Sequence, residues 1–206
     1  MFGGKKKTEN DFDFLLSNFT ARHKPERLDA LCKSTNFTKS EIRIMYQGFK
    51  QECPSGIVTE ETFKGVFSQY FPQGDATQYA HYVFNTFKHI SHKKTLTFEH
   101  FINLLSSLSR GTVNEKLKWV FGLYDINGDG YITKQEMLNI VSAIYDMLGH
   151  YTDPAVDEYS AMEHVEKVFN QIDSNKDGVI TFDEFMAWCQ KDEARTRSLL
   201  MLDTIL

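Results

Sequence analysis

The sequence predicts an all-α fold of four helix–loop–helix units arranged in two pairs, and three observations support it. Two twelve-residue loops, 125–136 and 173–184, share one pattern of acidic and amide side chains around a central glycine. Apolar residues recur at helical spacing before both loops. Two earlier segments, 51–62 and 89–100, keep the outline of the same loop without its acidic side chains. We therefore interpret the chain as an internal repeat of one structural unit.

The two complete loops have the side chains and the spacing that a calcium ion requires. Both fit the pattern D-x-[DN]-x-[DN]-G-x5-E, with side-chain oxygens at positions 1, 3 and 5 and a backbone carbonyl at position 7. The glutamate at position 12 can bind through both oxygens, which favours calcium over magnesium. The predicted ligands are Asp125, Asn127, Asp129, Tyr131 and Glu136, then Asp173, Asn175, Asp177, Val179 and Glu184, with Thr133 and Thr181 binding directly or through water. We predict two EF-hand Ca²⁺ sites.

Helices are predicted on both sides of each complete loop. The threonine at position 9 and the glutamate at position 12 have the spacing of a capping box, so a helix begins within the end of each loop. Ile132 and Ile180 occupy position 8, where paired EF-hands join by a short two-stranded contact. The apolar residues that repeat upstream are Leu117, Val120, Phe121 and Tyr124, then Val165, Val168, Phe169 and Ile172.

The two degenerate loops have lost their ligands. In place of positions 1, 3, 5 and 12 they carry Gln51, Cys53, Ser55 and Thr62, then His89, Ser91, Lys93 and His100. No carboxylate remains among these positions, so we predict that neither loop binds calcium. The spacing of the histidines fits no compact transition-metal site. We expect Val58 to pair with Leu96 as Ile132 pairs with Ile180.

Domain boundaries follow from the repeat. Residues 1–24 form a variable N-terminal tail, residues 25–109 hold the pair of metal-free loops, and residues 113–206 hold the calcium-binding pair with a C-terminal helix. Arg110-Gly111-Thr112 is predicted as the hinge between the pairs. The connection between the two calcium-binding units, after Gly149, is long, acidic and predicted to be mobile.

Two further helix starts can be read in the first half. Pro25 is expected to begin a helix that runs through Leu31, because proline suits the first turn. Thr38 and Glu41 have capping-box spacing and begin the next helix.

Composition restricts the classes of function. The chain has 206 residues, of which 41% are apolar and 25% charged, and a formal charge of −5. It has no basic face that would suggest nucleic acid as a partner. It contains no nucleophile elbow, phosphate loop or zinc signature, so we predict that it is not an enzyme.

The search for targeting signals restricts the expected location of the protein. We find no signal peptide and no apolar run long enough to span a bilayer. The cysteines are few and widely spaced, as expected for a reduced, intracellular protein. N-myristoylation requires a glycine directly after the initiator methionine, and Phe2 stands there.

An aromatic stripe runs through the first three units. Phe63, Phe67 and Phe71 recur at helical spacing after the first degenerate loop, and Phe101 and Leu105 do so after the second. Most such stripes are core, but a pair of EF-hands can also open a groove for a partner helix, and both readings stay open. The apolar C-terminal segment 195–206 either covers such a groove or packs as an ordinary helix.

The chain resembles the neuronal calcium sensor family over residues 25–206, and within it the Kv-channel-interacting branch. The stretches that carry this resemblance include Cys53-Pro54-Ser55-Gly56, Phe71-Pro72-Gln73-Gly74-Asp75, Arg110-Gly111-Thr112, Glu115-Lys116-Leu117-Lys118-Trp119, Tyr79-Ala80-His81-Tyr82 and Ala143-Ile144-Tyr145-Asp146-Met147. One departure is that the second unit, which commonly keeps some acidic ligands in this family, has none here.

The resemblance implies an auxiliary subunit of Shal-type (A-type) voltage-gated potassium channels. Members of this branch bind the channel's cytoplasmic N-terminal segment in a hydrophobic groove, raise its surface expression and slow its inactivation. Groove positions then fall on Phe63, Phe67, Phe71, Phe101, Leu105 and Trp119. The implied location is cytoplasmic, at the plasma membrane through the channel rather than through myristoylation.

Three other functions compete with this one. Relatives in the wider family, such as the frequenin-like proteins, regulate enzymes such as lipid kinases or guanylate cyclases. A calcium buffer would expose no partner surface and would gain nothing from two discarded sites. A transcriptional role, known within the branch, is disfavoured by the acidic balance of the chain.

Overall fold

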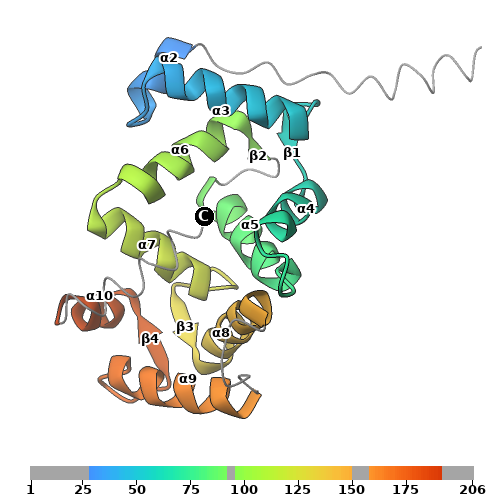
Figure 1. Cartoon of the computed structure of the whole chain (residues 1–206). Coiled ribbons are helices and arrows are strands. Elements are labelled where there is room, and N and C mark those ends of the chain that lie inside the picture. The colour runs from blue at the N-terminus through green and yellow to red at the C-terminus, as the bar shows by residue number, and fades with distance from the viewer. Residues whose placement is uncertain (1–27, 92–95, 150–157, 192–206) are drawn as a thin grey trace, which may run out of the picture.

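The computed structural model describes residues 28–91, 96–149 and 158–191, and these ranges are mostly helical (Figure 1). The helices are α2 (Leu28–Ser34), α3 (Lys39–Glu52), α4 (Glu60–Tyr70), α5 (Thr77–Ser91), α6 (Phe98–Arg110), α7 (Val113–Tyr124), α8 (Lys134–Leu148), α9 (Glu158–Ile172) and α10 (Phe182–Gln190). The strands are β1 (Ile57–Val58), β2 (Leu96–Thr97), β3 (Tyr131–Thr133) and β4 (Val179–Thr181). The predicted all-α fold of paired EF-hands is confirmed.

Each unit places a short strand between two helices, and the strands pair two by two. β1 pairs antiparallel with β2, and β3 with β4. Val58 stands opposite Leu96, and Ile132 stands opposite Ile180, as the sequence predicts. These side chains are buried, so each strand contact also anchors the core of its pair.

The threonine at loop position 9 caps the second helix of every unit. Thr59, Thr97, Thr133 and Thr181 all have extended backbone at the N-cap position. The hydroxyls of Thr59, Thr133 and Thr181 each accept a hydrogen bond from one of the first helical amides, which have no partner within the helix. Thr97 instead bonds the His100 ring through its backbone N–H and its hydroxyl. The first degenerate loop therefore keeps this hydroxyl cap without the acidic ligands, and the second keeps the threonine at the N-cap position.

The two pairs share one hydrophobic core. In Figure 1, α3 and α6 of the first pair lie at the top, α8 to α10 of the second pair lie at the bottom, and α5 and α7 lie at the same height between them. Helix α5 packs against both α7 and α8, and buried residues of both pairs belong to one contiguous cluster. Gly111 and Thr112 connect α6 to α7, where the hinge is predicted. The domain boundaries stay a prediction.

Some predictions fall outside the described ranges. These are the 1–24 tail, the helix start at Pro25, Lys93 in the second loop, the connection after Gly149 and the segment 195–206. The first described helix, α2, continues to Ser34 rather than ending at Leu31. None of the described helices is long and apolar enough to cross a membrane.

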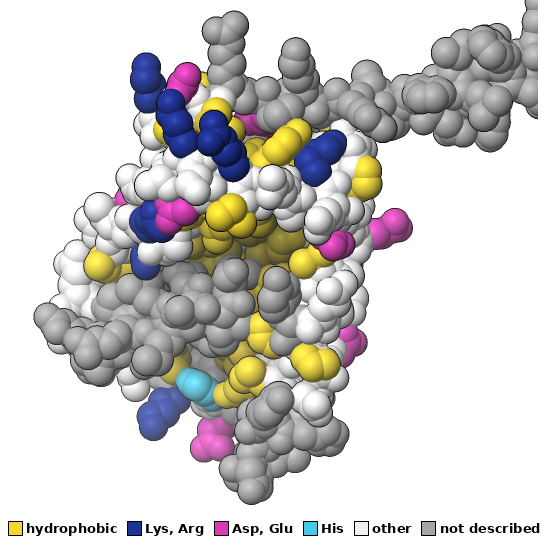
Figure 2. All heavy atoms as spheres, turned by 45° about the horizontal axis from the view of Figure 1, so that its top comes forward, with side chains coloured by type: hydrophobic (Ala, Val, Ile, Leu, Met, Phe, Trp, Pro, Cys, Tyr) yellow, Lys and Arg dark blue, Asp and Glu magenta, His cyan; other side chains and the backbone are white. Residues whose placement is uncertain are grey.

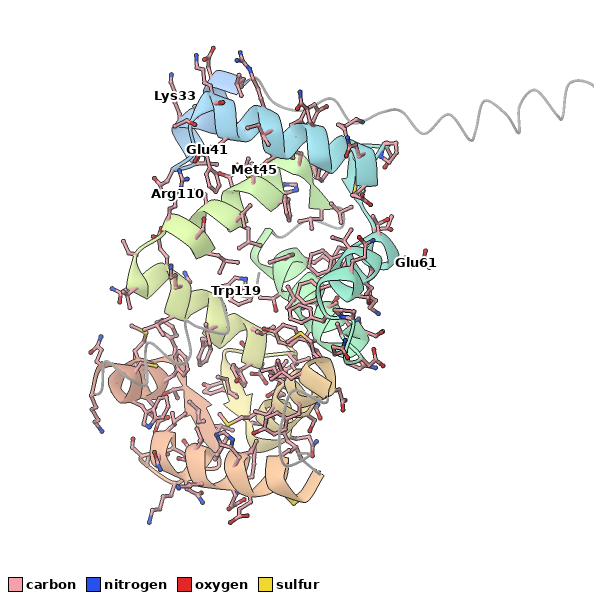
Figure 3. All side chains as sticks on the ribbon, viewed as in Figure 1. Lys33, Glu41, Met45, Glu61, Arg110 and Trp119 are labelled. Carbon is pink, nitrogen blue, oxygen red and sulfur yellow. The ribbon has the colours of Figure 1, made fainter. Side chains whose placement is uncertain are left out.

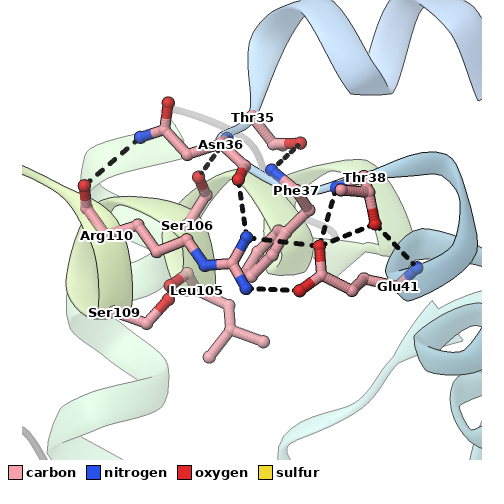
Figure 4. Close-up of polar contacts among 9 residues, drawn as sticks. All are labelled: Thr35, Asn36, Phe37, Thr38, Glu41, Leu105, Ser106, Ser109 and Arg110. Carbon is pink, nitrogen blue, oxygen red and sulfur yellow. Dashed lines mark hydrogen bonds and ion pairs between the residues drawn. The ribbon is translucent and has the colours of Figure 1, made fainter.

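An arginine at the end of α6 fastens the start of α3 to the rest of the first pair (Figures 3 and 4). The Arg110 guanidinium donates to both carboxylate oxygens of Glu41 and to the Asn36 carbonyl at 2.7 Å. Its plane lies over the Phe37 ring, 4.6 Å from the centroid. Glu41 also accepts the backbone N–H of Thr38 at 2.8 Å. One side chain thus joins a helix cap, an aromatic ring and the predicted hinge.

This arrangement predicts a pH-dependent contribution to stability. The Arg110 guanidinium, followed by the hydrogen bonds from Thr38, lowers the pKa of Glu41 from 4.5 to about 2. A carboxyl whose pKa is depressed on folding stabilises the protein above its ordinary pKa, and that contribution is lost as the pH falls. The Glu41→Gln variant should therefore be less stable than the parent at neutral pH, and the difference should shrink between pH 4.5 and about 2.

Chemical unfolding of both proteins across this pH range measures the difference. Glu61→Gln is the matched control, because Glu61 is exposed on α4 and points away from the molecule in Figure 3. A difference for Glu41→Gln that stays constant with pH would contradict the role assigned to its carboxylate.

Candidate calcium-binding loops

The loop of the third unit is wrapped around one buried carboxylate. Asp125 ends α7 and is only 8% exposed. Its Oδ1 accepts the N–H groups of Gly128 at 2.9 Å and Asp129 at 3.1 Å, and its Oδ2 accepts the N–H of Gly130 at 2.9 Å. These hydrogen bonds turn the loop through a tight curve with position 1 at its centre.

The loop of the fourth unit repeats this geometry. Asp173 accepts the N–H of Lys176 at 2.8 Å and of Gly178 at 3.0 Å. The turn requires left-handed backbone at positions 4 and 6, where φ is 61° for Lys176 and 88° for Gly178. Glycine adopts this conformation without steric cost, whereas lysine at position 4 does not. Position 4 of the third unit is a glycine, Gly128, so the two loops differ in backbone strain.

The glutamate at position 12 lies across each loop. Glu136 accepts the N–H and hydroxyl of Thr133 on Oε2, at 2.9 and 2.7 Å, and the N–H of Asn127 on Oε1 at 3.3 Å. Glu184 does the same, with Thr181 on Oε2 at 3.0 and 2.8 Å and the N–H of Asn175 on Oε1 at 3.4 Å. Positions 3 and 12 are thereby brought together from opposite ends of the loop.

The remaining ligand positions are held by hydrogen bonds within the loop. Asn127 donates its side-chain amide to Asp129 at 2.9 Å, and Asn175 donates to Asp177 at 2.8 Å. No group of three or more His, Cys, Asp or Glu side chains gathers as a metal cluster within the described ranges. In both loops the side chains at positions 3 and 5 are thus hydrogen-bonded to each other, and that they bind calcium stays a prediction.

The chemistry of each donor set fits a hard cation. All the predicted side-chain ligands offer oxygen atoms, which calcium prefers. Burial raises the pKa of Asp125 above its ordinary value, and the nearby charge of Asp129 adds to this, although three backbone N–H groups act in the opposite direction. A cation beside the ionised Asp125 would offset that cost of burial. Backbone and hydroxyl hydrogen bonds, first of all from Thr181, lower the pKa of Glu184 to about 2, so this carboxylate is ionised at neutral pH.

Position 2 distinguishes the two loops, and the sequence motif does not include it. Ser174 donates its N–H and its hydroxyl to Glu184 Oε1, at 3.1 and 2.9 Å. Ile126, at the same position of the third unit, packs against the core instead. A hydroxyl at position 2 is the signal that could have identified this second contact.

The first degenerate loop is held by hydrogen bonds of its own. The Lys50 ammonium donates to the Pro54 carbonyl, and Ser55 bonds both the N–H and the carbonyl of Ile57. At position 12, Thr62 bonds the Thr59 hydroxyl at 2.9 Å and does not extend a carboxylate over the loop. The absence of metal from the degenerate loops stays a prediction.

Four of the predicted groove residues lie in one aromatic row. On α4, Phe67 lies between Phe63 and Phe71, with ring centroids 5.5 and 5.4 Å away. Phe87 continues the row from Phe63 at 5.5 Å and contacts Trp119 at 6.4 Å. Figure 3 shows Trp119 on the side of α7 that faces α5.

The row is mostly interior, and its far end is accessible. Phe63, Phe67 and Trp119 are buried, whereas Phe71 is half-buried. The other two predicted groove residues, Phe101 and Leu105, are half-buried on α6. Figure 2 shows hydrophobic side chains gathered in a hollow on one face of the molecule. That these six residues bind a partner stays a prediction.

The capping threonine of the third unit should affect both folding and calcium binding. Thr133→Ala removes the hydroxyl that accepts the N–H of Glu136 and donates to its carboxylate. We expect the free energy of unfolding to fall by about 1 kcal/mol, as for other N-cap truncations, and calcium affinity to fall with it. Thr133→Ser should keep both.

Thr59→Ala is the second control, because it removes the same cap from a loop without ligands. It should reduce stability and leave calcium affinity unchanged. Chemical unfolding and calorimetric titration measure the two effects. Unchanged calcium affinity in Thr133→Ala would contradict a role of this cap in orienting Glu136.

The comparison with known families agrees with this geometry. Residues 114–190 match the family described as the EF-hand domain pair. The matched range runs from the first turn of α7 to the last residue of α10, so it includes both loops with complete ligand sets. This part of the chain is an EF-hand domain pair, which implies Ca²⁺ binding and supports a calcium-binding regulatory or sensor role.

Proposed function

We propose that the protein is a calcium-binding auxiliary subunit of a Shal-type voltage-gated potassium channel. It binds two calcium ions, one in each of the loops 125–136 and 173–184. It holds the cytoplasmic N-terminal segment of the channel in a hydrophobic groove formed around the aromatic row. It reaches the cytoplasmic face of the plasma membrane through this partner.

The proposal rests on one observation, which is that the calcium ligand sets and most of the aromatic row lie in different pairs of the protein. The second pair keeps complete oxygen ligand sets, while the first pair has replaced its ligands with internal hydrogen bonds such as Thr59 to Thr62. Most of the aromatic row belongs to the first pair. A buffer would gain nothing from this loss of sites, whereas a regulator needs one half for the ion and another for a partner. The channel as partner rests on the resemblance described above.

The residues of the third loop indicate how an ion would act. A bound Ca²⁺ would supply positive charge between the carboxylates of the loop. Asp125 ends α7, and Glu136 lies in the first turn of α8, so sharing one ion would fix the angle between these helices. Proteins built on EF-hands are generally not enzymes, and we infer that this chain acts by binding.

The number of sites is tested by removing one carboxylate at a time. Glu136→Gln and Glu184→Gln should each remove one high-affinity site, because the amide cannot bind through two anionic oxygens. Calorimetric titration should give two ions for the parent, one for each variant and none for the double variant. Sensor loops bind at about 10⁻⁷–10⁻⁵ M.

Glu115→Gln is the matched control. Glu115 caps α7 with Thr112 in the same way, with a 2.7 Å hydrogen bond, but lies outside the loops. It should leave the number of bound ions unchanged. Two ions bound at micromolar concentration by the double variant would show that the ligands are misassigned.

The partner is tested by calorimetric titration with the N-terminal peptide of a Shal-type channel, in calcium and then in chelator. We expect binding at micromolar concentration or tighter, and a scrambled peptide should not bind. Phe71→Ala should weaken binding, because Phe71 is the accessible end of the aromatic row. Failure of the authentic peptide to bind in either buffer would reject the channel and favour an enzyme as the regulated partner.

A further inference from the structure

Two glycines from opposite halves of the protein interlock where the α4–α5 connection meets the end of α8. A Cβ atom on Gly74 would lie 2.2 Å from the Met147 carbonyl oxygen and 2.4 Å from that of Asp146. A Cβ atom on Gly149 would lie 2.3 Å from the Gln73 carbonyl oxygen. The two backbones are therefore in direct contact, and neither side has room for a side chain. We call this contact the glycine junction.

A backbone hydrogen bond closes the junction. The N–H of Asp75 donates to the carbonyl of Asp146 at 2.9 Å. Between the two pairs, the Thr86 hydroxyl also donates to the Gly122 carbonyl, at a longer distance of 3.5 Å. Because the two main chains touch, a movement of the end of α8 would displace the α4–α5 connection directly. The junction thus adds a direct main-chain contact between the two pairs.

Both sides of the junction are tied to functional elements. On the second half, α8 runs unbroken from Lys134 to Leu148 and has Glu136 in its first turn. On the first half, the N–H of Gly74 bonds the carbonyl of Phe71 at 3.5 Å, and Asp75 accepts the N–H of Thr77 at 2.9 Å at the start of α5. A shift of the end of α8 would therefore reach the accessible end of the aromatic row.

We propose that the glycine junction transmits calcium binding in the third loop to the aromatic row. Glu136 sets the orientation of α8, the end of α8 carries Asp146 to Gly149, and these residues position the segment that follows Phe71. The inference rests on the proposed function, because it takes the third loop as a calcium site and the row as a partner site. By linkage, a partner on the row must change calcium affinity by the same factor as calcium changes partner affinity.

The first test needs no partner. Hydrogen exchange of the parent protein should show the Asp75 amide more strongly protected in calcium than in chelator. Glu136→Gln should abolish this difference, whereas Glu184→Gln should retain most of it, because only Glu136 lies on α8. Equal protection of Asp75 in both buffers would overturn the proposal whether or not a channel peptide binds.

The second test disturbs the junction itself. Gly74→Ala inserts a methyl group against two carbonyl oxygens of α8. Gly65→Ala and Gly48→Ala are the matched controls, because an added Cβ meets no atom within 4 Å at either position. The readouts are the calcium affinity, the protection of the residues around position 74, and the ratio of channel-peptide affinities in calcium and in chelator.

We expect Gly74→Ala to bring the ratio of channel-peptide affinities in calcium and in chelator toward one, while both loops still bind calcium. Couplings of this kind are typically about 5- to 150-fold, so the loss is measurable. The two control variants should keep the ratio of the parent. If a folded Gly74→Ala variant keeps the parent's ratio of peptide affinities in calcium and in chelator, the proposal is overturned and the coupling is assigned to the α6–α7 connection.

If Gly74→Ala does not fold, the exchange comparison among the parent, Glu136→Gln and Glu184→Gln still decides the matter. The outcomes also separate the two levels of inference. Calcium-dependent protection of Asp75 without peptide binding would reject the channel as partner and retain the junction as the coupling route. Peptide binding without such protection would retain the channel as partner and reject the junction as the coupling route.

Discussion

The structure depends on one local constraint, the threonine that caps the second helix of each unit at loop position 9. Its extended backbone closes the short strand and starts the helix, so it fixes positions 8 and 12 relative to each other. Position 8 enters the core through pairs such as Ile132 and Ile180, and position 12 faces the loop. In the third and fourth units, the same hydroxyl also donates to the glutamate that would bind calcium. The constraint that folds the unit is thus also the one that orients its ligand.

Because the threonine cap and the strand contact do not depend on the acidic side chains, two loops can lack those side chains and keep the fold. The strand pairing and the helix cap need only a small apolar residue and a threonine, and both remain in the first unit as Val58 and Thr59. Other contacts hold the first pair together. Arg110 joins Glu41 and Phe37 across two elements, and α4 packs through ring contacts such as that between Phe63 and Phe67.

Sequence patterns predicted the loops, the caps and the strand partners, because each of these features is set by residues within about a dozen positions of one another. They could not predict the ion pair between Glu41 and Arg110 or the contact between Gly74 and Asp146. These contacts join distant segments whose individual residues are ordinary surface types. Nor could they divide the aromatic stripe into interior and accessible parts, since Phe67 and Phe71 have the same spacing signal and differ only in what packs over them.

The predicted calcium loops lie in the second pair and most of the aromatic row lies in the first, so the contacts between the pairs are the route by which one could affect the other. The shared hydrophobic core transmits strain because it is closely packed, and the glycine junction adds a direct main-chain contact to it. Glycine allows this contact because it has no side chain. At Gly149 the chain also adopts φ of 53°, a conformation that most other residues avoid. The glycines at this contact therefore meet a physical requirement that is independent of both the calcium loops and the identity of any partner. The sequence gives no sign of this contact, although Gly74 lies in one of the stretches that carry the family resemblance.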